Sequence, residues 1–334
     1  MHTRIRAWAQ LVRVPNTLTA CADVLAGFSI AVGHWFAIDG IAVSLLLMCL
    51  ASVCLYWAGM VLNDVHDIEA DRIQRRKGPL VDGRIDIQTA AIAGWMLLFT
   101  GVLLAGVSSY LLPLLPDLGN TSTRNQSKWL VVGIGSLLAM VIAAYDSRLK
   151  ATIFGPLLMG MCRGLNLLLG ISLGWCLVWP SDSDWIVVAI AVFGHVGFVM
   201  GITLAARRES LMDQSSTRLA IAWMISLLGI VAISVCPLWA TGPLWARDRP
   251  LRLDPRSLYP ILIGLLMVPW LRRAIRSVRN PGVGTLVPAI KQAILSIIFL
   301  DAAIALQFAG STPGMIVCGL AIPTLALARV FRMT

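Results

Sequence analysis

Ten long apolar runs restrict how this chain can fold more than any other feature of its sequence. A helix needs about 17 to 25 mostly apolar residues to cross about 30 Å of hydrocarbon. Runs of this kind occupy residues 17–36, 41–62, 88–112, 129–145, 154–179, 185–206, 219–240, 258–271, 286–309 and 315–330. The eighth and tenth are short, so nine spans remain an alternative to ten. The sequence therefore predicts an all-α, polytopic membrane protein, a helical bundle of nine or ten transmembrane helices that forms one domain over residues 1–334.

The composition excludes a soluble globular protein with an ordinary polar surface. Of the 334 residues, 58% are hydrophobic and only 13% are charged. The net charge of +10 could suggest a nucleic-acid partner, but in a membrane protein the positions of Lys and Arg decide what the charge means. Most of the 27 basic residues fall in alternate connecting segments, beginning with the N-terminal one. We therefore expect a protein of the cell (inner) membrane with a cytoplasmic N-terminus, in contact with the lipid bilayer and not with nucleic acid.

An acidic cluster follows directly after the second apolar run, where that helix would reach the cytoplasm. It consists of Asn63, Asp64, Asp67 and Asp71. If the helix continues, spacings of three and four residues place the three aspartates on one stripe, with Asn63 at its edge. Three like charges repel one another unless some are protonated or a cation joins them. Oxygen ligands at this density suit Mg²⁺, which proteins usually hold with one or two carboxylates together with substrate phosphates.

A basic segment follows the acidic cluster, over residues 72–86. It is interrupted by Gly and Pro, and it includes Arg76, Lys77 and Arg84. A metal held by carboxylates, with flexible cationic side chains beside it, suits a diphosphate. The cations neutralise the negative charge of the diphosphate that the metal does not neutralise. The residues alone leave two interpretations open, namely polyphosphate chemistry and simple pairing of acids with bases at a solvated helix end.

These segments resemble the motifs of a known family. The run N-D-x-x-D-x-x-x-D at residues 63–71 resembles the motif that the UbiA superfamily of intramembrane aromatic prenyltransferases carries at the cytoplasmic end of its second span. Residues 78–86 are similar to the family's R-P-x-P-S-G-R-I-S, residues 145–150 (Y-D-S-R-L-K) to its Y-S-P-P-L-K, and residues 13–16 to its opening. The resemblance runs from the N-terminus through about the sixth span.

The resemblance implies a UbiA-like fold and a Mg²⁺-dependent transfer of an isoprenoid chain from a prenyl diphosphate to an acceptor within the membrane. The residues that it implies for binding Mg²⁺ and the diphosphate are Asn63, Asp64, Asp67 and Asp71. Arg84 and Lys150 would lie near the phosphates, and Tyr145 near the first prenyl carbons. The residues expected to act in catalysis are Asp64, Asp67, Lys150 and Tyr145.

The chain departs from the family at the sixth span, where members carry a second acidic motif. Residues 201–208 read G-I-T-L-A-A-R-R and contain no aspartate. Glu209 and Asp213 stand four residues apart and could still face one metal from a helix. Alternatively, Arg207 and Arg208 could contact the phosphates directly and replace a second Mg²⁺.

The first motif also differs on its C-terminal side. Gly78 stands where the family places an arginine, which leaves Arg76 or Lys77 as substitutes. This pattern resembles a divergent UbiA-like subgroup, the EboC proteins, which keeps the first motif and has segments similar to residues 161–166 and 291–301.

Ionisable residues also occur inside the predicted spans. Asp23 lies in the first span, Arg163 in the fifth and Asp301 in the ninth. An arginine at membrane depth must face the bundle interior or water and find a partner. Arg163 therefore either reaches the diphosphate or an acidic acceptor, or forms a structural pair with Asp23 or Asp301. We interpret His195, in the sixth span, as a hydrogen-bonded core residue.

Three functions stay open, of which a prenyltransferase is favoured. A non-catalytic or accessory membrane protein that binds a lipid diphosphate would need the first acidic motif but not the second. A small-molecule carrier would also place charges inside spans, but the sequence shows neither convincing inverted repeats nor paired broken helices.

Overall fold

The computed structural model consists of helices, with no strand among the residues that it describes. Those residues are 2–33, 35, 38–74, 77–112, 121–147, 149–178, 180, 182–209, 215–240 and 252–330. The helices are α1 (His2–Leu11), α2 (Thr17–Val32), α3 (Ile41–His66), α4 (Ile68–Ile73), α5 (Ile87–Tyr110), α6 (Thr121–Asp146), α7 (Gly155–Trp175), α8 (Asp182–Glu209), α9 (Ser216–Val235), α10 (Leu258–Arg279), α11 (Val283–Ala309), α12 (Ser311–Gly319) and α13 (Ala321–Val330), with 3₁₀ helices η1 (Val14–Asn16), η3 (Leu149–Ala151) and η4 (Cys236–Trp239). The predicted all-α bundle is confirmed.

Ten helical segments of the described chain are long and apolar enough to cross a membrane, which favours ten spans over nine. The helix predicted for the eighth run, residues 258–271, was too short, because α10 extends beyond the apolar residues to Arg279. The last two turns of this helix carry arginines. The tenth span, Ser311–Val330, is divided between α12 and α13, with Leu320 between them.

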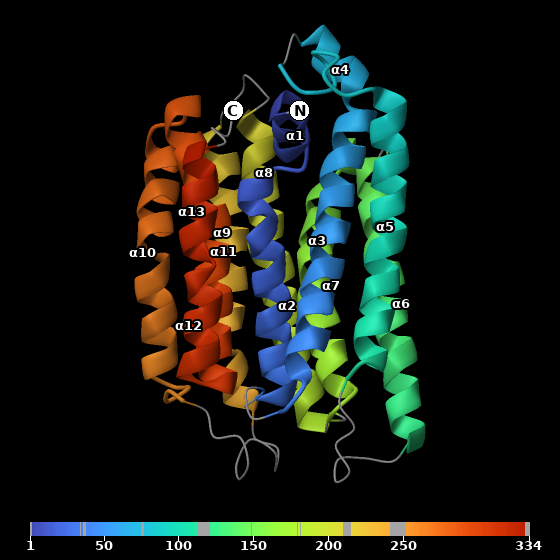
Figure 1. Cartoon of the computed structure of the whole chain (residues 1–334). Coiled ribbons are helices and arrows are strands. Elements are labelled where there is room, and N and C mark those ends of the chain that lie inside the picture. The colour runs from blue at the N-terminus through green and yellow to red at the C-terminus, as the bar shows by residue number, and fades with distance from the viewer. Residues whose placement is uncertain are drawn as a thin grey trace.

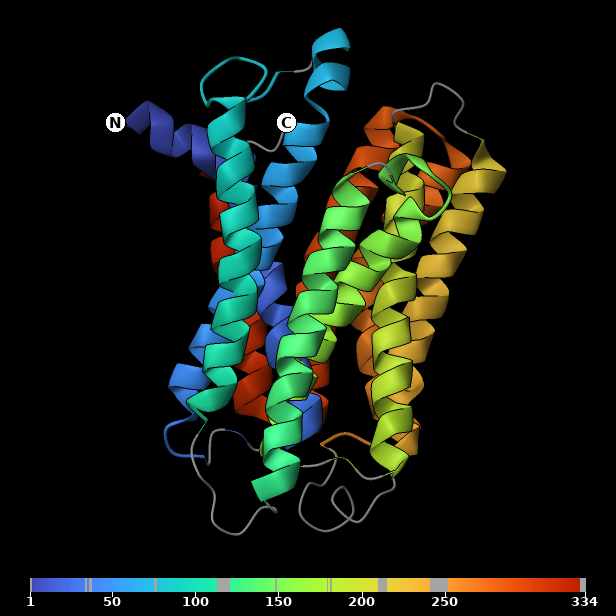
Figure 2. The same cartoon turned by 90° about the vertical axis from the view of Figure 1, so that its right-hand side faces the viewer.

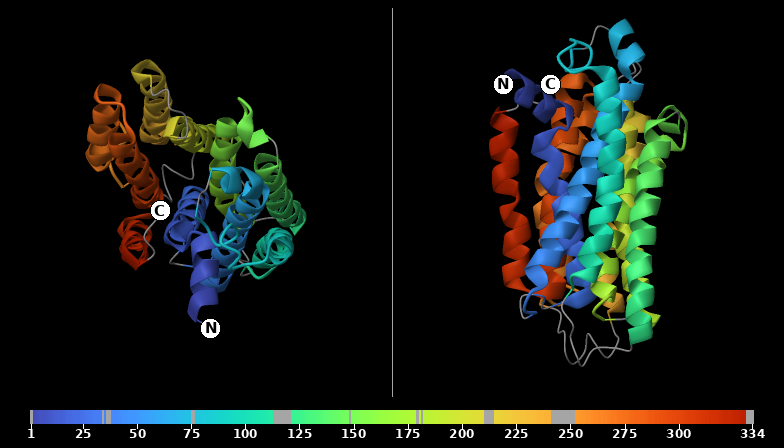
Figure 3. Two further views of the ribbon diagram at one scale, coloured as in Figure 1. Left: turned by 90° about the horizontal axis from the view of Figure 1, so that it is seen from above. Right: turned by 45° about the vertical axis from the view of Figure 1, so that its right-hand side comes forward.

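Helix α2 lies in the middle of the bundle and is the most buried of the ten spans (Figures 1 and 3). It packs against α3, α7 and α11. Its approach to α7 is very close, because a Cβ atom on Gly27 would lie 2.0 Å from the carbonyl oxygen of Leu167, and one on Gly170 would lie 2.1 Å from that of Val24. Small residues at such crossings allow transmembrane helices to pack backbone to backbone. The polar residues of α2 are thereby held against those of α7.

The other helices surround this centre, with α5 against α3, α6 and α8 against α7, α9 against α8, and α10 and α12 against α11. A continuous apolar core joins residues from α2 through α13. The outward face of α5 carries the exposed side chains of Trp95, Met96 and Phe99. Exposed aromatic and aliphatic side chains on a span-length helix indicate contact with lipid rather than water. The chain is therefore built as an integral membrane protein.

The acidic cluster lies at one end of the bundle, where α4 extends past the long helices, and α1 lies at the same end (Figure 2). A loop returns from α4 to α5 and passes through Gly83, whose φ of +69° favours glycine. Helix α5 then begins at a regular N-cap, because the carboxylate of Asp86 accepts a hydrogen bond of 2.9 Å from the backbone N–H of Thr89.

Candidate functional site

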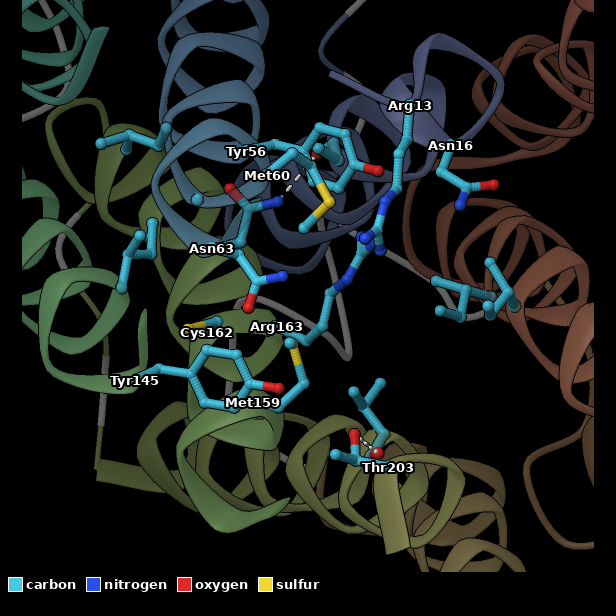
Figure 4. A pocket seen from close by; sticks show the side chains of 18 of the residues that line it. Arg13, Asn16, Tyr56, Met60, Asn63, Tyr145, Met159, Cys162, Arg163 and Thr203 are labelled. Atoms are coloured by element: carbon cyan, nitrogen blue, oxygen red, sulfur yellow. Dashed lines mark hydrogen bonds between the residues drawn. The ribbon is translucent and has the colours of Figure 1, made fainter. Parts of the chain in front are cut away.

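A cavity of about 320 Å³ lies between α2, α3, α6, α7, α8 and α11. Most of its wall is apolar, with side chains such as Leu55, Leu138, Ile142, Ile202 and Ile294. Polar side chains line it at two levels, about three helical turns apart along α3. The level near the end of α3 has Arg13, Asn63, Tyr145 and Asp146, and the deeper level has Ser52, Arg163 and Asn166. Figure 4 shows Arg13, Asn63, Tyr145 and Arg163 around the cavity, each from a different segment of the chain.

The acidic cluster is positioned by a nearly continuous helix. Helix α3 ends at His66 and α4 begins at Ile68, but the backbone hydrogen bonds run on through Asp67, from Asp67 N–H to Asn63 (3.0 Å) and from Asp71 N–H to Asp67 (2.8 Å). The predicted helical stripe is therefore present with a local interruption at Asp67. Asn63 lines the cavity, whereas Asp64 and Asp67 keep 25% and 32% of their side chains exposed.

Two cations from distant segments meet the acidic cluster. Arg13 Nη2 lies 3.4 Å from Asp64 Oδ1. Lys150, on η3, forms an ion pair with Asp67 and donates a hydrogen bond of 3.2 Å to the side-chain oxygen of Asn63. Arg13 has a φ of 51°, the left-handed region, and is the one described non-glycine residue with positive φ. Such a conformation costs about 1–2 kcal/mol and is often found at functional positions.

The end of α6 contributes two neighbouring residues to the same level of the cavity, Tyr145 and Asp146. Tyr145 was predicted as a site residue, and it lines the cavity as expected. Asp146 and Arg13 were missed, because both were treated as parts of a resembling segment and not as individual charges. The sequence signal for Asp146 is the carboxylate in Y-D-S-R-L-K, where the family motif has a serine.

The deeper polar level is a hydrogen-bonded network that joins α2, α3 and α7. Arg163 donates to Asp23 (2.9 Å) and to the hydroxyl of Thr19 (2.6 Å). Asn166 donates to the same carboxylate oxygen of Asp23 (2.9 Å) and accepts from Ser52 (2.7 Å). Of the two alternatives for Arg163, the structural pair with Asp23 is observed. Its role as a diphosphate ligand stays a prediction, since its side chain also lines the cavity.

A buried histidine extends this network toward α11. His195 Nε2 lies 2.9 Å from Asp301 Oδ1, and its Nδ1 lies 3.0 Å from the carbonyl oxygen of Ala191. Because a carbonyl only accepts, Nδ1 carries a hydrogen, and the proton between Nε2 and Asp301 is shared by that pair. The ligand atoms of Asp23, His195 and Asp301 lie within 4.8 Å of one another, close enough in principle for a metal. Arg163 already supplies a positive charge there, so a divalent ion would leave an uncompensated positive charge in the apolar interior.

The remaining predicted site residues lie outside the cavity wall. Arg84 donates to Gln10 (2.9 Å) and Asp82 (3.1 Å), and Arg207 donates to the carbonyl oxygen of Thr152 (2.7 Å). Lys77 and Asp71 are described and do not line the cavity. The predictions for Arg76 and Asp213, and for the side chains of Arg208 and Glu209, fall outside the described residues.

Comparison with known proteins shows the family of this chain and several relatives. A model of the UbiA prenyltransferase family matches residues 21–281. Digeranylgeranylglyceryl phosphate synthase of Metallosphaera sedula is 25% identical over 275 residues, which cover 78% of this chain and 81% of that protein. The proteins of the same name from Methanococcus aeolicus and Methanocaldococcus jannaschii are 31% and 33% identical over 105 and 102 residues, about 30% of this chain. These two alignments span only 37% and 35% of those relatives.

Solved structures share the fold. A UbiA homologue from Aeropyrum pernix, in its apo form, has a TM-score of 0.59 and 16% identity, over 86% of this chain and 96% of its own. A UbiA homologue from Archaeoglobus fulgidus, bound to GPP and Mg²⁺, has a TM-score of 0.57 and 14% identity, over 89% of this chain and 99% of its own.

Proposed function

The chain belongs to the UbiA prenyltransferase family, and we propose that it transfers an isoprenoid chain from a prenyl diphosphate to an acceptor within the membrane. The observation that carries this proposal is the meeting of Asn63, Tyr145 and Lys150, from three separate segments, at the polar end of an otherwise apolar cavity. Its volume of about 320 Å³ is at the lower end of the range for ligand pockets. The digeranylgeranylglyceryl phosphate synthases among its relatives and the GPP-bound homologue support the same reaction class.

The donor atoms of the acidic cluster suit Mg²⁺. Asn63 offers an amide oxygen, and Asp64 and Asp67 offer carboxylates that are partly exposed. Mg²⁺ prefers such oxygen ligands and is usually coordinated by substrate phosphates as well. We propose that Asn63, Asp64, Asp67 and Asp71 hold it. When bound, it would stabilise the negative charge that develops on the departing diphosphate.

Lys150 and Arg13 would bind the phosphate oxygens that remain. Their present pairs with Asp67 and Asp64 are partly exposed, so they contribute little stability and can exchange for a more highly charged ligand. Lys77, Arg84, Arg163 and Arg207 stay candidates for further phosphate contacts.

The transfer itself requires that the bond between the first prenyl carbon and the diphosphate oxygen breaks, with both electrons leaving on the oxygen. The acceptor then forms its bond to that carbon with an electron pair of its own and loses a proton. The ring of Tyr145 would face the positive charge that develops on the prenyl carbons. The apolar wall, including Ile142 and Ile294, would hold the chain and keep out the water that would otherwise capture it.

The proposal also covers the domain organisation, the membrane location and the orientation of the chain. We propose that the whole chain, residues 1–334, is a single domain in the cell (inner) membrane, with its N-terminus and the acidic cluster on the cytoplasmic side. The distribution of Lys and Arg supports this orientation, and the continuous core from α2 to α13 supports one domain. We further propose that the chain is a divergent member that resembles the EboC proteins, because the described residues 201–207 of α8 carry no acidic side chain.

A second candidate is a protein that binds a lipid diphosphate without transferring the chain. The same lack of acidic residues at 201–207 favours it, because a two-metal arrangement would need them. Both candidates use the first acidic motif, so binding alone does not distinguish them and turnover does.

The test is a thermal-shift titration of the full chain in detergent with geranyl diphosphate and longer prenyl diphosphates, with and without Mg²⁺, on the wild type and Asp67→Ala. A ligand of the folded state raises the midpoint by mass action. Stabilisation that requires both Mg²⁺ and Asp67 is expected, followed by release of diphosphate when candidate acceptors are added. If no prenyl diphosphate shifts the wild type, the donor site is refuted. Stabilisation without turnover for any acceptor would favour the binding protein.

A further inference from the structure

Asp146 is a buried carboxylate that the local structure does not explain. It is the last residue of α6, and its side chain is only 2% exposed. Its Oδ2 atom has no hydrogen-bond partner among the described residues, although it lies in the wall of the cavity. The C-terminal end of a helix favours cations and disfavours carboxylates. Neither helix stability nor a hydrogen bond at this oxygen therefore accounts for the residue.

The position of this carboxylate relates it directly to the acidic cluster. Helix α6 packs against α3, and a Cβ atom added to Gly59 of α3 would lie 3.8 Å from Asp146 Oδ2. Gly59 precedes Asn63 by one helical turn, so both lie on the face of α3 that Asp146 approaches, and both line the cavity. A Cβ atom at Gly59 would also lie 3.2 Å from Ile142 Cγ2, so α6 packs closely against this face of α3.

The other charged residues around the acidic cluster already have partners. Lys150 pairs with Asp67, and Arg13 pairs with Asp64. A buried carboxylate oxygen without a partner is costly unless a cation or a proton joins it. A cation held at Asn63, Asp64 and Asp67 would lie at the level of the cavity that Asp146 lines.

We infer that Asp146 is a further ligand of the divalent cation at the acidic cluster, contributed by α6, the helix that packs against α3 at this level of the cavity. This inference rests on the proposed function, since it adds a residue to the same site. It gives the site a carboxylate from a second helix, which residues 201–207 of α8 do not provide.

The test measures metal binding rather than activity. Mn²⁺, as a paramagnetic substitute for Mg²⁺, is titrated into the full chain in detergent, alone and with inorganic diphosphate, and free Mn²⁺ is followed by electron paramagnetic resonance. The variants are Asp146→Asn and Asp146→Ser, with Asp67→Asn as the reference and Asp86→Asn as the control. Asp86 caps α5 outside the cavity, and asparagine caps as well as aspartate.

Both Asp146 variants should weaken Mn²⁺ binding about tenfold or more, as loss of a residue in a metal site commonly does, while Asp86→Asn should bind like the wild type. In the absence of metal, Asp146→Asn should unfold near the temperature of the wild type, because asparagine has nearly the same size and shape and Asp146 Oδ2 has no hydrogen-bond partner among the described residues to lose. A residue with a purely structural role would instead lower that temperature and leave the affinity unchanged.

The outcomes separate the two proposals. If Asp67→Asn weakens Mn²⁺ binding but both Asp146 variants bind like the wild type, the inference is overturned and the proposed function stands. If the wild type itself does not bind Mn²⁺ with or without diphosphate, the proposed metal site fails and the inference fails with it.

Discussion

Two groups of aspartates in this protein have opposite surroundings. Asp23 and Asp301 lie in the middle of the bundle, fully buried, and receive their partners from neighbouring helices, Arg163 and His195. Asp64 and Asp67 lie at the end of α3, partly exposed, and pair with two long side chains from distant segments. The first group is compensated from within the fold, by partners on helices that pack directly against one another. The second is compensated only by flexible cations, which a metal and a diphosphate can displace.

The comparison shows that an aspartate in a membrane protein is not by itself a functional residue. What distinguishes the two groups is whether the partner is held by packing or by a side chain that can move away. The buried group should therefore control folding stability, and the group at the end of α3 should control ligand binding.

The largest expected effect comes from breaking the buried pair. Asp23→Ala leaves the guanidinium of Arg163 buried without its carboxylate, which should lower the free energy of unfolding by about 3–5 kcal/mol. The measurement is the thermal midpoint of the purified protein without ligand. The double variant Asp23→Ala/Arg163→Met should recover much of the loss, because no unpaired charge remains. A double variant as unstable as the single one would contradict the idea that charge compensation holds this group in place.

A smaller effect should follow from separating the helices that carry the buried pair. Gly170→Ala places a Cβ atom 2.1 Å from the carbonyl oxygen of Val24, so α2 and α7 must move apart. Overpacking of this kind typically costs about 1–3 kcal/mol. Gly133→Ala is the matched control, because a Cβ atom at that helical position meets nothing within 4 Å, and it should be neutral or slightly stabilising. Equal midpoints for the two variants would show that the close crossing is not required.

The third prediction concerns the group at the end of α3 and has its effect on binding. Lys150→Met removes the cation that pairs with Asp67 and bonds to Asn63. Without ligand the midpoint should change little, because a partly exposed pair contributes about 0–1 kcal/mol. The affinity for a prenyl diphosphate with Mg²⁺ should fall about tenfold to a hundredfold, the usual cost of losing a charged hydrogen bond. A large loss of stability with unchanged affinity would move Lys150 into the structural group.

Much of the fold and part of the site could be predicted from the sequence, because their signals are local. The ten spans follow from the length of apolar runs, and the acidic cluster follows from spacings of three and four residues on one helix. Partners far apart in sequence could not be predicted. Asp64 and Arg13 are separated by 51 residues, Asn63 and Lys150 by 87, and Asp23 and Arg163 by 140.

The reason is that no local period records how each helix is rotated about its axis. In this protein the rotation of α2 and α7 is set by glycines such as Gly27 and Gly170, which only the packed structure reveals as contacts. The same limit explains why Asp146 was missed. Its place in the chain, at the end of an apolar run, looks like an ordinary solvated helix terminus, and only its burial marks it as different.

The smallest expected effect concerns a third setting, an exposed carboxylate whose partners come from its own backbone turn. The N–H of Thr89, with its hydroxyl, donates to Asp86 and holds the pKa of that carboxyl below its usual range. A lowered pKa in the folded state means that the stabilisation by this carboxylate is present above the ordinary carboxyl pKa of about 3.9 and is lost as the pH falls through the folded value.

Asp86→Asn keeps the cap but cannot titrate. Between pH 7 and pH 3, the midpoint of the wild type should therefore fall by slightly more than that of Asp86→Asn. Identical pH profiles would mean that the ionised form of Asp86 contributes nothing measurable, so that partners supplied by a single exposed turn are weaker than those of the other two groups of aspartates.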